Sequence, residues 1–131
     1  MSEISSKRQQ FARDFGAHHV LDSSKIDVVE EVKRISDGRG ADVAFDTAGV
    51  QICLDTALKA IKARGTLVNI AIWEKRPTLE MNDLIFRERV YMGIAGYSTQ
   101  DFEDVIHAIS TGLFFVLFLG KKDIGVRADE I

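Results

Sequence analysis

Residues 40–49, GADVAFDTAG, and residues 65–73, GTLVNIAIW, are two short and almost wholly apolar runs. A stretch with helical spacing of apolar residues, from about Val50 to Ala63, separates them. Apolar runs that alternate with a helix are typical of parallel strands buried on both faces of a sheet. The carboxyl ends of such strands form the crevice in which ligands bind. The two runs therefore predict an α/β sheet with a ligand-binding edge.

The rest of the chain continues this alternation. Apolar spacing and turn residues predict helices over about 5–16, 25–36, 79–86 and 98–109, and strands over 19–21 and 89–95. Ser98 and Asp101 have the spacing of a capping box, which marks the start of the last helix. On that helix we expect four apolar residues to face inward: Phe102, Val105, Ile106 and Ile109. The order of elements favours a doubly wound parallel α/β sheet.

One part of a nucleotide-binding domain is not found in this sequence. Such a domain opens with a strand and a turn of the form G-x-G-x-x-G, and neither precedes the predicted strands. We therefore expect an incomplete Rossmann-like sheet that lacks its first βα unit. Residues 1–112 form the partial domain in this interpretation, and residues 113–131 form a divergent C-terminal tail.

The composition argues against several functional classes. A chain of 131 residues fits one domain, and a net charge of -3 without a basic stripe gives no reason to expect nucleic acid binding. The single cysteine, Cys53, excludes an internal disulfide and a multi-cysteine zinc site. The apolar run 113–119 is far shorter than the ~20 residues of a membrane helix. Since the polar N-terminus resembles no secretory signal, we expect a cytoplasmic protein.

Candidate binding residues lie where predicted strands end. Glu3 comes just before a helix, where a carboxylate either accepts both ribose hydroxyls of an NAD adenosine or simply faces solvent. Arg8 either flanks that adenosine or is a surface arginine. Small residues at Thr47, Ala48 and Gly49 either let a flat ring approach the backbone or form a tight turn.

The remaining polar residues do not form a catalytic set. Asp46 at a strand end is more typical of a helix N-cap or a hydrogen-bond network than of a catalyst. A zinc site needs three or four convergent donors, and we interpret the three histidines as structural. Cys53 falls in a helix and is expected to pack as a small hydrophobic residue. The sequence thus predicts a crevice without catalytic residues or metal ligands.

The runs SEISSKRQQFARDFGAHHVLD, residues 2–22, and GRGADVAFDTAGV, residues 38–50, resemble the zinc-containing medium-chain alcohol dehydrogenases. The resemblance is greatest to the branch that acts on 2,3-butanediol and polyols, and it covers about Ser2 to Gly112. It implies NAD-dependent oxidation of a secondary alcohol to a ketone. In that family a catalytic zinc polarises the alcohol oxygen, and hydride passes to the nicotinamide.

The resemblance also implies roles for individual residues. Glu3 corresponds to the acid that binds the adenosine ribose, with Arg8 beside it, and a glutamate there favours NAD over NADP. The positions near the nicotinamide are given by two short segments. They are Thr47 and Ala48 on the ribose side, and Ile70, Ala71 and Ile72 on the carboxamide side.

The departures from the family are large. Its zinc ligands belong to a preceding catalytic domain that this sequence does not contain, so zinc is expected only in full-length members. In the strand order 3-2-1-4-5-6, losing the first strand separates strand three from strands four to six. We expect a truncated or mis-spliced gene product that binds NAD weakly or not at all and is inactive alone. The alternative is a non-catalytic interaction module, which pairs through exposed strand edges with a second copy or a full-length relative.

Overall fold

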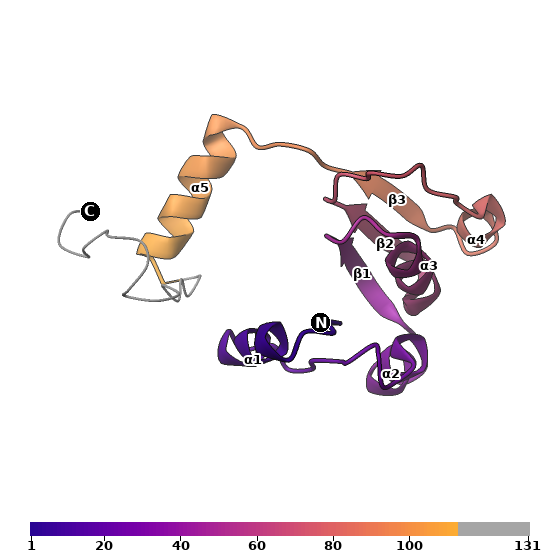
Figure 1. The fold of residues 1–131 in the computed structure, drawn as a ribbon. Helices are drawn as coiled ribbons and strands as arrows, with labels where there is room; N and C mark the ends of the chain where they lie inside the picture. The colour runs from indigo at the N-terminus through magenta and orange to yellow at the C-terminus, as the bar shows by residue number, and fades with distance from the viewer. Residues whose placement is uncertain (113–131) are drawn as a thin grey trace. The chain divides into compact units, whose positions relative to one another are not determined.

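The computed structural model describes residues 1–112 (Figure 1). The chain divides into two compact units, Met1–Gly96 and Tyr97–Ile131. The first unit holds the sheet, and helix α5 (Thr99–Ser110) belongs to the second. Each unit is described by itself.

The sheet of the first unit has three parallel strands in the order β1-β2-β3. They are β1 (Ala41–Asp46), β2 (Ile61–Asn69) and β3 (Val90–Gly93). The register places Phe45 beside Val68 and Val68 beside Met92, so these three side chains share one face. The predicted parallel α/β sheet is confirmed.

Four helices accompany this sheet in the first unit (Figure 1). They are α1 (Ser6–Asp14), α2 (Val28–Ile35), α3 (Gln51–Ala60) and α4 (Met81–Ile85). Asp27 begins α2 by accepting hydrogen bonds from the backbone N–H groups of Val29 and Glu30. In the second unit, the predicted capping box between Ser98 and Asp101 is present at the start of α5.

The predicted strand at 19–21 is reduced to a single parallel bridge between Ser2 and Leu21. Glu3 N donates to Leu21 O at 2.9 Å, and Leu21 N donates to Met1 O at 2.8 Å. Among the described residues this bridge lies outside the three-stranded sheet. The segment expected as the strand at 19–21 is therefore not paired with β1, β2 or β3.

The core lies between α3 and one face of the sheet. Leu54 and Leu58 of α3 pack with Ile61 and Leu67 of β2, and all four are at most 2% exposed. Partly buried residues surround this cluster: Ala41, Ala44, Ala57, Trp73, Leu79, Leu84 and Tyr91. Burial of these apolar side chains is the main stabilising contribution in this unit.

The opposite face of the sheet corrects the expectation of burial on both faces. Four of its apolar side chains are exposed, by 47% for Val43, 64% for Phe45, 46% for Val90 and 47% for Met92, whereas Val68 between Phe45 and Met92 is only 8% exposed. The physical reason is that α3 packs on the other face, while no described helix makes comparable contacts here. The two apolar runs do form strands, as predicted. Residues 1–112 do not include a layer of helices that covers this second face.

The apolar side of α5 is a second correction. Phe102, Val105, Ile106 and Ile109 were expected to face inward, and they are 41–55% exposed. Ring stacking between Tyr97 and Phe102, with centroids 6.3 Å apart, is the aromatic contact within this segment. Within the second unit, no described residue covers the rest of this side of the helix.

Candidate functional site

Asp46 joins the two segments that follow β1 and β2 at the carboxyl edge of the sheet. Its backbone carbonyl accepts hydrogen bonds from Ile70 N at 2.9 Å and Ala71 N at 3.1 Å. Its side-chain Oδ1 accepts from Ala48 N at 2.9 Å and Gly49 N at 3.3 Å. Asp46 is only 3% exposed, so these bonds are largely shielded from water. One residue therefore fixes both segments in which cofactor contacts are expected.

Asn69 and Trp73 hold the second of these segments from its other side. Asn69 Nδ2 donates to Ala71 O at 2.9 Å, and Trp73 Nε1 donates to Asn69 Oδ1 at 2.9 Å. Gly49 lies so close that a Cβ there would be 3.1 Å from both Ala71 Cβ and Ile72 O. This close approach and the φ of +64° at Gly49 both favour glycine at this position. The two segments consequently form one compact edge.

The exposed surface of this edge is small and apolar. Thr47 and Ala48 are exposed, as are Ile70 at 44% and Ile72 at 95%. Such a surface, bordered by fixed backbone groups, suits a flat ring that needs both apolar contact and hydrogen bonds. The structure thus brings together Thr47, Ala48, Ile70, Ala71 and Ile72, as the sequence interpretation requires.

Replacing Asp46 tests whether its carboxylate holds the first segment. In Asp46→Ala, the amides of Ala48 and Gly49 lose their acceptor, and we expect their hydrogen exchange to accelerate about 5- to 30-fold, the equivalent of ~1–2 kcal/mol. The amides of Ile70 and Ala71 bond to the backbone carbonyl and serve as an internal control. Asp46→Asn retains an acceptor oxygen and should preserve most of the protection. Equal acceleration at all four amides would contradict this role.

Glu3 and Arg8 form a bidentate ion pair. Arg8 Nε lies 2.8 Å from Glu3 Oε2, and Arg8 Nη2 lies 3.0 Å from Glu3 Oε1. Ser5 N also donates to Glu3 Oε1, at 2.8 Å. The hydrogen bonds from Arg8, followed by that from Ser5, lower the pKa of the Glu3 carboxyl from 4.5 to about 2. The carboxylate with a neighbouring cation expected near the N-terminus is therefore present.

This pair predicts how Glu3 responds to pH. Because the pKa of Glu3 is lowered in the folded chain, the pair contributes above its ordinary pKa of 4.5 and is lost as pH falls through about 2. By carbon-13 NMR, we expect the Glu3 carboxyl to remain ionised at about pH 3.5, where an ordinary glutamate is mostly protonated. Arg8→Gln should raise this pKa, whereas the matched Lys7→Gln should not. An unchanged pKa in Arg8→Gln would show that the pair does not form in solution.

Two groups near Asp46 have raised pKa values. Burial, with a smaller effect of the Asp46 charge, raises the pKa of the Cys53 thiol and of the Tyr91 hydroxyl. Both groups therefore stay protonated and neutral near pH 7, and neither is an activated nucleophile. Within residues 1–112, no three His, Cys, Asp or Glu side chains gather in a way that could hold a metal ion.

Asn69 and Trp73 were not foreseen as site residues. Asn69 pairs with Asp46 across the two strands, so a polar residue near the end of each strand lies at the same level of the sheet. A polar residue within an apolar strand was the available signal. Its partner could not be found without knowing the register.

In the part of the chain that the structure describes, no helix is long and apolar enough to cross a membrane.

Comparisons with known proteins agree with this architecture. The family model described as "Zinc-binding dehydrogenase" matches residues 1–111. The chain is 38% identical over 122 residues to "(R,R)-butanediol dehydrogenase" of Bacillus subtilis, covering 93% of this chain and 35% of that protein. It is 36% identical over 106 residues to the enzyme of the same name from Neisseria gonorrhoeae, covering 80% and 30%.

A solved structure gives the same result. The crystal structure of 2R,3R-butanediol dehydrogenase from Bacillus subtilis superposes with a TM-score of 0.80 at 37% identity, covering 88% of this chain and 32% of that one. The chain thus spans about a third of the length of the relatives it matches.

Proposed function

The chain belongs to the zinc-binding dehydrogenase family, and we propose that it is part of the NAD-binding portion of an alcohol dehydrogenase. The proposed reaction is oxidation of a secondary alcohol such as 2,3-butanediol to a ketone. The observation that carries the proposal is the edge fixed by Asp46, which holds the segments after β1 and β2 side by side. We further propose that residues 1–131 alone have no dehydrogenase activity. The proposed location of the protein is the cytoplasm.

The described residues fit the ends of an NAD molecule. Glu3 has two carboxylate oxygens that receive three hydrogen bonds within the chain, which leaves acceptor capacity for a ribose hydroxyl. The small residues Thr47 and Ala48 leave space for the second ribose, and the backbone groups of 70–72 suit a carboxamide. When bound, NAD supplies the acceptor for the hydride that leaves the alcohol carbon.

The residues of this chain have positioning roles in that proposal. Asp46 keeps the two segments at a fixed separation, and the apolar side chains of Ile70 and Ile72 exclude water from one side of the ring. Glu3 disfavours a 2′-phosphate by charge repulsion, so we propose NAD rather than NADP as the cofactor. The described residues include no group of His, Cys, Asp or Glu side chains that fits a zinc ion.

A chimera tests the proposal directly. Residues 1–111 would replace the matching segment of the Bacillus subtilis butanediol dehydrogenase, and NADH formation from (R,R)-2,3-butanediol would be followed by absorbance. We expect an active chimera. Glu3→Gln should lower kcat/KM for NAD about tenfold, mainly through KM, because ribose contacts are lost without change to the reacting groups.

Arg76→Gln is the matched control in that chimera, because Arg76 is exposed in the loop after β2. If Glu3→Gln and Arg76→Gln change kcat/KM for NAD equally in a folded chimera, the proposed role of Glu3 is contradicted. For the isolated chain, we expect no NADH formation with 2,3-butanediol, NAD and zinc. Measurable turnover by the purified chain would overturn the inactive assignment.

A second candidate function rests on the uncovered parts of the sheet. Both β1 and β3 are edge strands among the described residues, and Phe45 and Met92 lie exposed on the open face. These features favour strand pairing with another copy or with a full-length relative. Size-exclusion chromatography and thermal unfolding together distinguish this pairing function from the dehydrogenase function. A monomer that unfolds cooperatively would contradict the pairing function.

A further inference from the structure

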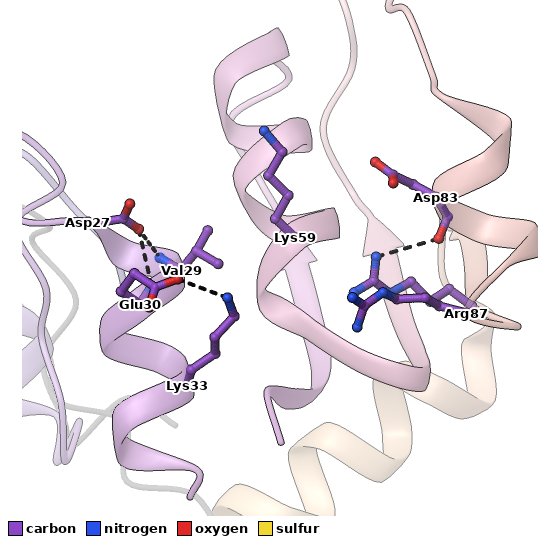
Figure 2. Close-up of a pocket in the computed structure, with 8 residues that line it drawn as sticks. Asp27, Val29, Glu30, Lys33, Lys59, Asp83 and Arg87 are labelled. Carbon is purple, nitrogen blue, oxygen red and sulfur yellow. Dashed lines mark hydrogen bonds and ion pairs between the residues drawn. The ribbon is translucent and has the colours of Figure 1, made fainter. Parts of the chain in front are cut away.

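A cavity of about 350 Å³ lies in the first unit (Figure 2). It is bordered by α2, the end of α3 and the segment from α4 to β3. Lys59 precedes β2 and Arg89 precedes β3, so this is the amino end of both strands. The cavity is thus separate from the proposed cofactor edge. Its lining includes four basic side chains, three acidic side chains and one valine.

Two of the three carboxylates are already engaged. Asp27 Oδ1 accepts from Val29 N at 2.8 Å and Glu30 N at 3.1 Å, and Glu30 Oε1 lies 2.8 Å from Lys33 Nζ. The side chain of Asp83 has no ion pair or hydrogen bond among the described residues. The backbone N–H groups satisfy Asp27 but do not cancel its charge, so only Glu30 is neutralised by an ion pair in this cavity.

The basic groups are less fully neutralised. Lys59 and Arg87 have no carboxylate within ion-pair distance in the described part of the chain, and Figure 2 shows Lys59 between the α2 side chains and Arg87. Arg89 donates to the backbone carbonyls of Ile61, Lys62 and Asp83. These carbonyls satisfy its N–H groups but do not cancel its charge. Three cations consequently face two carboxylates that no described ion pair neutralises, those of Asp27 and Asp83.

The two arginines also repel each other. Burial and then the nearby charge of Arg87 lower the pKa of Arg89. An anion placed between Arg87 and Arg89 would relieve this repulsion and accept hydrogen bonds from the planar guanidinium of Arg87.

We propose that this cavity binds a phosphate group, with Lys59 and Arg87 as its mobile ligands and Arg89 as a fixed positive charge. A phosphate group suits these side chains better than a carboxylate does, since it offers more acceptor oxygens to the N–H groups of Lys59 and Arg87. The cavity volume also suits a small phosphate monoester. This site is independent of the proposed dehydrogenase function.

The test is calorimetric titration of the full chain at constant ionic strength. Inorganic phosphate and glycerol 3-phosphate serve as separate ligands, with sodium chloride as the comparison salt. We expect saturable phosphate binding that Arg87→Gln weakens about tenfold and Arg76→Gln leaves unchanged. Tighter binding of glycerol 3-phosphate would identify a monoester as the ligand, and equal or weaker binding would identify the free ion.

Asp83→Asn provides a result of opposite sign. Removing the negative charge of Asp83 should tighten phosphate binding about threefold. A damaged fold would not produce tighter binding. Absence of saturable binding in the wild-type chain would overturn the proposal. Equal losses in Arg87→Gln and Arg76→Gln, or weaker binding in Asp83→Asn, would also overturn it.

Discussion

Leu54→Ala is expected to lower the free energy of unfolding by about 2–5 kcal/mol. Leu54 is 1% exposed and lies in the cluster with Leu58, Ile61 and Leu67 between α3 and the sheet. Truncation removes apolar burial and leaves a cavity, since the neighbouring backbone of α3 and β2 relaxes only in part. Urea unfolding followed by circular dichroism measures the change. A loss of this size is a large fraction of the ~5–15 kcal/mol stability of a small domain.

Ile52→Ala is the control on the same helix. Ile52 is 74% exposed, so its truncation should change stability by no more than about 0.5 kcal/mol. The two variants remove large aliphatic side chains two positions apart and differ mainly in burial. Equal losses would mean that α3 packs through a different side in solution, and they would contradict the core described above.

The types of the main elements could be predicted from the sequence, but some of their ends could not. Residues 61–63 were assigned to a helix because Ile61 continues the apolar spacing of Leu54, Ala57 and Leu58. In the structure Ile61 begins β2 and pairs with Ala41 of β1. That pairing is long-range, and local spacing contains no information about it.

Burial was the property that sequence reasoning overestimated. An apolar pattern indicates which side chains favour the interior, but it does not supply the layer that covers them. Phe45 and Phe102 both lie on correctly predicted elements and are 64% and 55% exposed. The sequence interpretation expected unpaired strand edges, but it did not predict the open face of the sheet.

The candidate site could be predicted only in part for a similar reason. The five-residue separation of Glu3 and Arg8 is local, and the structure brings the two together as expected. Asp46 was correctly interpreted as a network residue. Its hydrogen bonds to Ile70 and Ala71 depend on the pairing of β1 with β2, so its function in joining both segments required the three-dimensional structure.

Gly40→Ala is expected to destabilise the chain by more than about 2 kcal/mol. Gly40 has a φ of +90°, which disfavours any residue with a Cβ. A Cβ at this position would also lie 2.7 Å from Ala60 O and 3.0 Å from Lys62 N. These backbone atoms belong to the junction of α3 and β2, so they cannot move without disturbing the pairing of β1. Urea unfolding again gives the measurement.

Gly38→Ala separates the two causes of this loss. Gly38 has a similar φ of +80°, but a Cβ there would meet no atom within 4 Å. Its substitution should therefore cost only the left-handed backbone strain, about 1–2 kcal/mol. The additional loss in Gly40→Ala measures the close approach of the start of β1 to the α3–β2 junction. If the two variants lose the same stability, that approach is looser in solution, and the junction does not fix where β1 begins.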